Sequence, residues 1–146
     1  MSTYIDLVNY QRVITERHLM QLIEQDTALL DETEAVGIRE MSAYLCQRFD
    51  TDALFEDGKA TDYPEVVMYL TDIVLYHLHT RLAPGKVPEV RAQRYLDAQK
   101  WLTDVREGKL CADLPLPIDP ETGEADQADD GPFIIDSIYE RKNYRY

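Results

Sequence analysis

The sequence predicts an all-α fold, a small four- to five-helix bundle followed by an extended acidic C-terminal tail. Up to about residue 110, long apolar residues recur every three or four positions, and no stretch shows the sustained alternation of a strand. Beyond that point, four prolines and two glycines interrupt the chain. We therefore expect a helical domain over residues 1–110 and a tail over residues 111–146.

The first predicted helix covers roughly Thr15 to Gln25, with Thr15 as its N-cap residue. A shorter helical turn precedes it, because Thr3–Asp6 has the form of a capping box. The second predicted helix runs from about Glu32 to Phe49. Its apolar positions repeat at intervals of three and four: Ala35, Ile38, Met41, Leu45 and Phe49.

Two details of this second helix are predicted as well. Asp31, with Glu34 three residues later, forms a capping box that would set the start of the helix. Gly37 interrupts a run of good helix formers, so we expect another helix to approach closely there.

The third predicted helix starts at Pro64, a favourable first-turn residue, and ends before Pro84 and Gly85. It is apolar almost all the way round. A helix of this kind is central in its domain or is covered by partner subunits.

The fourth predicted helix starts at Pro88 and stops at Gly108, with one apolar and one charged side. The apolar side carries Tyr95, Ala98, Trp101, Leu102 and Val105, and the charged side carries Glu89, Arg91, Arg94, Asp97, Lys100, Asp104 and Arg106. The connection Asp50–Asp62 is rich in acidic residues, so we expect an exposed loop. The core and assembly residues predicted on the last two helices are Leu70, Ile73, Tyr76, Tyr95, Trp101 and Leu102.

Composition excludes several classes of function. With 15 basic and 28 acidic residues the chain carries a net charge of −13, which argues against clamping duplex DNA or docking on anionic membranes. No run of about 18 apolar residues could cross a bilayer. The N-terminus has no signal-peptide pattern, and the two cysteines, Cys46 and Cys111, need not pair, so we expect a reducing cytosol or a cytosolic assembly.

The sequence contains no positive signal for an enzyme, a metal or a cofactor. His77 and His79 are two positions apart and point about 200° away from each other on a helix, so they cannot share a metal. We expect one of them to be buried and the other to lie at the surface. Cys46 lies beside the apolar stripe of the second predicted helix, so we expect it to be a buried small apolar residue. A nucleophilic cysteine would need a nearby base, and no sequence signal supplies one.

The tail has two parts of opposite character. From Asp113 to Asp130 it holds seven acidic residues and no basic one, which predicts an extended linker. The end combines an apolar run with tyrosines and basic residues, the types that anchor interfaces. The predicted docking residues are Phe133, Ile134, Ile135, Ile138, Tyr139, Arg141, Lys142, Tyr144, Arg145 and Tyr146. This segment could also add as a strand to a partner's sheet, and the alternative is a frayed terminus.

Five stretches of the helical part resemble the Mu-like phage and prophage head–tail connector family of adaptor, or head-completion, proteins. They are Met41–Phe49, Asp72–Arg81, Pro84, Val90–Leu102 and Gly108–Leu110. The resemblance covers about residues 3–112 and carries no catalytic signature. The long acidic linker and its aromatic end depart from the family pattern.

The resemblance implies an adaptor at the head–tail junction of the virion. It would form a homo-oligomeric ring, commonly twelvefold, under the portal protein, and join the capsid to a tail-side connector or completion protein. It implies neither sequence-specific nucleic-acid binding nor a membrane. An acidic wall also suits a channel through which DNA must slide without sticking.

Two other hypotheses remain open. A small acidic protein could mimic DNA and regulate a nucleic-acid enzyme, in which case its binding should collapse with added salt. A metal-dependent enzyme could use the acidic loop Asp50–Asp62, in which case a divalent cation should raise the thermal stability.

Overall fold

The computed structural model describes residues 4–125, and in this range it contains six α-helices, one 3₁₀ helix and no strand. The predicted all-α class is therefore confirmed. The elements are α1 (Leu7–Gln11), α2 (Glu16–Leu22), α3 (Thr27–Leu45), α4 (Thr51–Leu54), η1 (Ala60–Asp62), α5 (Pro64–Leu82) and α6 (Glu89–Arg106). None of the helices described is long and apolar enough to cross a membrane.

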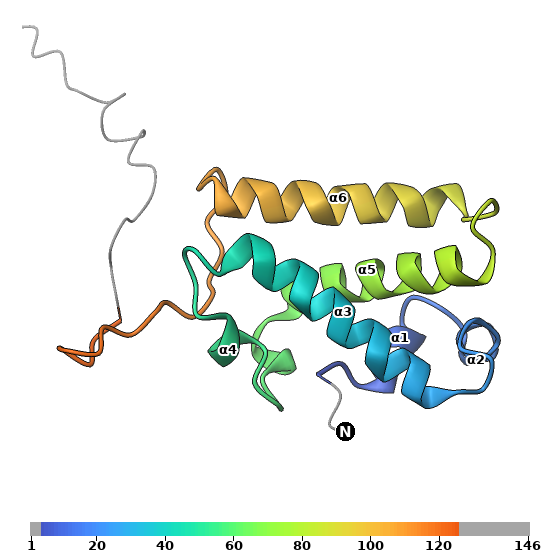
Figure 1. The fold of residues 1–146 in the computed structure, drawn as a ribbon, viewed down its shortest axis with the longest axis horizontal. Coiled ribbons are helices and arrows are strands. Elements are labelled where there is room, and N and C mark those ends of the chain that lie inside the picture. Colours follow the sequence, from blue (N-terminus) through green and yellow to red (C-terminus); the bar gives the residue numbers. More distant parts are fainter. Residues whose placement is uncertain (1–3, 126–146) are drawn as a thin grey trace, which may run out of the picture.

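Helix α5 is the centre of the fold. It lies beside α6, crosses under α3 and also packs against α1, α2 and η1 (Figure 1). Its side chains at Leu70, Ile73, Val74, Leu75 and Leu78 are fully buried. Most of the apolar pattern is thus explained within a single chain, because the other helices of the domain cover α5, while Met68 and Leu82 on the same helix stay exposed.

The close approach predicted at Gly37 is confirmed. A Cβ atom at this position would lie 2.8 Å from the Leu70 Cδ1 atom and 3.3 Å from the Val74 Cγ2 atom. Both atoms belong to α5, so the missing side chain lets α3 press its backbone against the central helix.

The predicted start and end of α3 are wrong. The helix begins five residues before Glu32, at Thr27, and the Asp26 carboxylate caps it by accepting the Ala28 N–H at 3.0 Å. It ends at Leu45 rather than Phe49. The Asp31–Glu34 capping box does not form, because Asp31 lies inside the helix.

Helix α2 has the predicted cap but is shorter than expected. The Thr15 hydroxyl accepts the His18 N–H, as predicted. The helix ends at Leu22 because Glu24 and Gln25 have positive φ angles of 53° and 65°, which helical residues do not adopt.

The segment between α3 and α5 is more ordered than the exposed loop that we expected. It forms α4 and η1, and Leu54 inserts into the core with no exposed surface. Its acidic residues have different roles. Asp50 caps α4 by accepting the Ala53 N–H, whereas Asp57 and Asp62 are exposed to solvent.

Helix α6 buries the predicted side against α5 and α3. Ala98, Trp101, Leu102 and Val105 are buried there. The charged side is exposed except at two residues: the Arg91 side chain turns inward toward α5 and is 14% exposed, and the Asp104 side chain is 16% exposed.

Candidate interaction surfaces

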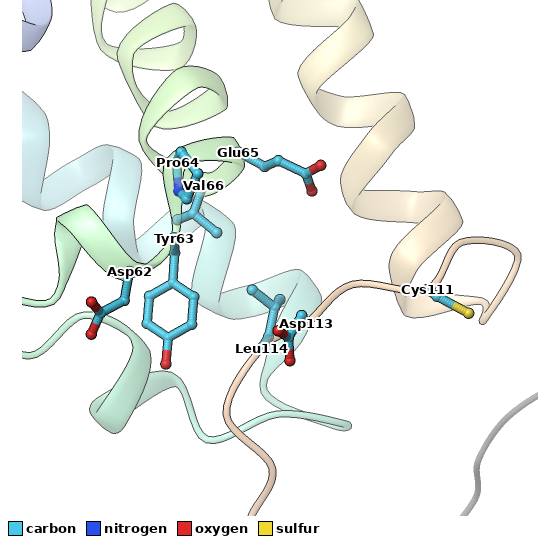
Figure 2. Close-up of a pocket in the computed structure, with 8 residues that line it drawn as sticks. All are labelled: Asp62, Tyr63, Pro64, Glu65, Val66, Cys111, Asp113 and Leu114. Carbon is cyan, nitrogen blue, oxygen red and sulfur yellow. The ribbon is translucent and has the colours of Figure 1, made fainter.

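A pocket lies where α5 begins and where the chain passes after α6. Its volume is about 320 Å³, and it is lined by Asp62, Tyr63, Pro64, Glu65, Val66, Cys111, Asp113 and Leu114 (Figure 2). Three of these side chains are carboxylates, and Val66, Leu114 and Pro64 give the pocket an apolar part. The pocket therefore combines an acidic rim with an apolar wall.

The acidic rim has little compensation from neighbouring cations. Asp62 has one cation close by, the Lys59 Nζ at 3.8 Å, and both side chains are about half exposed. Ion pairs between exposed side chains contribute little to stability. Within the described range, no ion pair is found for Glu65 or Asp113. The pocket thus presents a net negative surface.

The buried Tyr4 side chain belongs to the same region. Its ring packs edge-on against Phe55 with the centroids 5.3 Å apart. Burial, and then the charges of Tyr63, Asp62 and Glu34, raise the pKa of Tyr4 to about 12. Among the described residues, the buried Tyr4 hydroxyl has no hydrogen-bond partner.

The chain after α6 stays on the domain for a few residues and then leaves it. Ala112 and Leu114 pack against the core, and the Asp50 N–H donates to the Pro115 carbonyl at 2.8 Å. From there the chain runs away from the helices (Figure 1). It forms a turn closed by an isolated bridge between Ile118 and Ala125. The predicted tail therefore begins with a segment that is fixed at its start.

A half-buried polar and aromatic cluster joins α3, α5 and α6 on another side. The Glu40 carboxylate accepts the Tyr95 hydroxyl at 2.7 Å and lies 2.8 Å from the His77 Nε2 atom. The Tyr95 ring stacks on Tyr76 with the centroids 4.1 Å apart. Burial and the Glu40 carboxylate raise the pKa of Tyr95. The cluster holds three helices together through one acid.

The predicted core and assembly residues fall into two groups. Leu70, Ile73, Trp101 and Leu102 are buried inside the domain. Tyr76 and Tyr95 are only partly buried, so their stacked pair reaches the surface.

Two buried carboxylates were not anticipated from the sequence. Glu34 is 2% exposed and accepts the Tyr4 N–H at 2.6 Å, the Ile5 N–H at 3.1 Å and the Tyr10 hydroxyl at 2.9 Å. Burial raises the pKa of Glu34, and the three donors oppose that rise. One carboxylate therefore anchors the whole N-terminal segment to α3.

The second buried acid is Asp72, on α5. Its oxygens lie 3.7 Å from Arg91 and 3.5 Å from Arg94, both on α6. Arg91 also donates to the Val13 carbonyl at 3.1 Å, so the pair connects α5, α6 and the segment before α2. Burial raises the pKa of Asp72 and lowers that of Arg91, and their mutual attraction opposes both changes.

The histidines and Cys46 are placed only partly as expected. His79 is buried, with its Nδ1 atom 2.7 Å from the Leu75 carbonyl, and the more exposed His77 bonds to Glu40. Cys46 is exposed, so its predicted burial is wrong. It follows the last residue of α3 and lies beyond the buried stripe. In residues 4–125, no group of three or more His, Cys, Asp or Glu side chains is placed to hold a metal.

The predicted docking residues of the tail, Phe133 to Tyr146, lie outside the described residues. Sequence reasoning missed the pocket because its lining comes from two distant segments, residues 62–66 and residues 111–114. A usable signal was the Asp62–Glu65 stretch around Pro64, which places two acids at a helix start.

The fold and these surfaces define a small helical protein with an acidic pocket beside the exit of its C-terminal segment. A comparison with family models matches residues 4–130 to the family described as bacteriophage Mu, Gp36. Because this match covers most of the chain, the chain belongs to that family of phage proteins. No curated protein and no solved structure matches the chain.

Proposed function

We propose that this protein is a structural head–tail connector, an adaptor that forms a ring under the portal and joins the capsid to the tail. The observation that carries the proposal is membership of the phage Mu Gp36 family over residues 4–130. In this proposal the protein has no catalytic role. Its partners are other copies of itself, the portal protein and a tail-side protein, and its place is the head–tail junction of the virion.

The surface of the domain supports the proposal. Large apolar side chains are exposed on several helices, including Val36, Met68, Leu82, Val90 and Leu96. Val90 and Leu96 are more than half exposed. Exposed apolar residues distributed over several helices suit a subunit with neighbours on more than one side.

The charge supports the same role. A net charge of −13 gives a subunit that repels the phosphate backbone. A connector has to let DNA pass without holding it. A ring of such subunits, twelvefold to match a portal, meets that requirement.

The proposal is tested by binding to the portal. Purified protein is mixed with the portal ring of the same phage or prophage, and the complex is isolated by sedimentation and imaged by electron microscopy. We expect one ring of the protein on one end of the portal, still bound in molar salt because apolar contacts survive screening.

Two results would overturn the proposal. One is no binding to the portal at any concentration. The other is salt-sensitive binding to a nucleic-acid enzyme without portal binding, which would favour the DNA-mimic alternative. Met68→Asp in the full chain is the variant to compare, because it alters an exposed apolar residue without touching the core, and we expect it to weaken ring formation while the domain stays folded.

A further inference from the structure

We propose that the acidic pocket between Asp62–Val66 and Cys111–Leu114 receives the C-terminal segment 133–146 of a second copy of this chain. The inference rests on the proposed function, because it names the contact through which neighbouring subunits of the ring hold one another. It gives segment 133–146 a binding site on the helical domain of a neighbouring subunit.

The first argument is the composition of the pocket. Asp62, Glu65 and Asp113 supply carboxylates around an opening whose inner surface includes Val66 and Leu114 (Figure 2). A volume of about 320 Å³ is within the range of pockets that bind ligands. Such a site fits an apolar or aromatic side chain flanked by cations.

The second argument is the composition of the occupant. Segment 133–146 begins with an apolar run, Phe133–Ile135, and ends with three basic residues among three tyrosines. Arginine and lysine form charge-assisted hydrogen bonds with carboxylates, and tyrosine fills an apolar pocket while its hydroxyl reaches the rim. These 14 residues are the part of the chain that combines both features after the acidic linker.

The third argument is the direction of the chain, which favours a neighbour over the same subunit. After Leu114 the chain is fixed to Asp50 through Pro115 and then runs away from the helices (Figure 1). The described part of the acidic linker, up to Ala125, thus leads away from the pocket of its own subunit, and like charges oppose a turn back toward that pocket.

The linker between Leu114 and Phe133 is long enough to carry the C-terminal segment to a neighbouring subunit. Eighteen residues separate Leu114 from Phe133, but residues 118–125 fold into a turn whose ends are paired. The remaining spans, four residues from Leu114 to Ile118 and eight from Ala125 to Phe133, reach roughly 40 Å at about 3.3 Å per residue. Helices α3 and α5, the longest in the described part of the chain, have 19 residues each and measure roughly 28 Å. The linker is therefore long enough to cross one subunit and reach the next.

The test uses the native cysteine in the pocket. Cys111 is exposed and lines the pocket, and Cys46 is the other exposed thiol. In the full chain with Cys46→Ser, we introduce Tyr144→Cys and oxidise with copper phenanthroline, with and without the portal. We expect a disulfide between Cys111 of one chain and the new thiol of another, seen as covalent dimers and higher ladders on a non-reducing gel.

Three control variants accompany this test. Cys111→Ser in the same background should abolish the ladder. Asp62→Lys with Glu65→Lys should lower its yield about fivefold or more, because exposed attractive pairs become repulsive ones. Glu89→Lys, at the start of α6 and at the opposite end of the helix from the pocket, should leave the yield unchanged. Circular dichroism confirms that each variant is folded.

The outcomes separate this inference from the proposed function. Monomers with an internal disulfide would show that the tail binds its own domain, and no Cys111-dependent bond in either condition would show that the pocket is not its receptor. Either result overturns the inference while portal binding, measured separately, still decides the function. Ladders without portal binding would leave the inference standing and overturn the function.

Discussion

The two ends of the described chain are attached to the helices to very different extents. The N-terminal segment buries Tyr4, Ile5, Tyr10 and Ile14 in the core. It is also held by polar contacts, because Glu34 accepts three of its donors and Arg91, which pairs with Asp72, donates to the Val13 carbonyl. The C-terminal segment is held by the side chains of Ala112 and Leu114 and by the hydrogen bond from Asp50 to Pro115. We infer that the first end is part of the fold and the second is an arm for assembly.

The two ends differ in the free energy that is needed to detach each of them from the helices. Opening the N-terminal end exposes four buried apolar or aromatic side chains and breaks three hydrogen bonds to Glu34, which costs far more than one lost hydrogen bond. Opening the C-terminal end exposes the partly buried Ala112 and Leu114 and breaks the hydrogen bond from Asp50 to Pro115. Segments with few buried contacts and exposed backbone are those that open most readily.

The largest expected loss of stability comes from the core residue Trp101, and the losses expected at the two ends are smaller. Trp101 is 7% exposed and stacks on Tyr69 with the ring centroids 4.7 Å apart, in the core to which both segments attach. Trp101→Ala should lower the free energy of unfolding by about 3–5 kcal/mol. Urea unfolding followed by circular dichroism measures it, and a loss below about 1 kcal/mol would show that the ring does not belong to the core.

The second prediction concerns the N-terminal end. Glu34→Ala removes the acceptor of three donors, and we expect a loss of roughly 3 kcal/mol, since each unpaired buried donor costs about 1–3 kcal/mol and water relieves part of this. Glu34→Gln keeps one acceptor oxygen and should lose less. Urea titration gives both values. Equal losses below about 0.5 kcal/mol would mean that this end is not anchored as described.

The third prediction concerns the C-terminal end. Leu114→Ala should cost about 1 kcal/mol, because the side chain is only partly buried, and truncation after Ala125 should cost less still. Thermal unfolding of the full and truncated chains makes the comparison. A truncation that destabilised the helices as strongly as Glu34→Ala would remove the distinction between the two ends.

The smallest expected effect is a pH dependence from His79, in the last turn of α5, whose ring packs edge-on against His18 of α2. Burial lowers the pKa of His79 below its ordinary value of 6.5, with Arg91 and His18 adding to the decrease and the Leu75 carbonyl opposing it. The unfolded chain therefore binds this proton more readily than the folded one. Stability from His79 is complete above about pH 6.5 and is lost as pH falls toward the folded pKa.

The contribution of His79 to the pH dependence of stability is measured by comparing the wild type with His79→Gln. The melting temperature of the wild type should fall more between about pH 8 and about pH 5.5 than that of His79→Gln. Glu34 and Asp72 titrate in the opposite sense, because their raised pKa values favour the folded state in acid, but they are common to both proteins. Parallel curves for the two proteins would exclude a buried neutral His79.

Sequence reasoning predicted the parts of the molecule that depend on apolar periodicity and on local caps. It located α5 and α6, the Thr15 cap and the close approach at Gly37, because each depends on spacing within one segment. The start of α3 was missed because the capping-box pattern pointed to Asp31 alone, whereas Asp26 caps the helix without such a pattern.

The polar part of the molecule was not predictable in the same way. Glu34 and Arg91 occupy positions that read as a cap residue and a solvated face, yet both are turned inward by partners more than 20 residues away. The pocket likewise brings Asp62 and Asp113 together across about 50 residues. Partners that are distant in the sequence leave no periodic signal.

The most direct test of the account is light scattering coupled to size-exclusion chromatography, over a wide concentration range and with portal added. It compares the full chain with the chain ending at Ala125. The account predicts a ring-sized mass for the full chain, a monomer for the shorter chain, and nearly equal melting temperatures for the two. Equal masses, or a shorter chain that no longer folds, would contradict the assignment of the C-terminal arm to assembly.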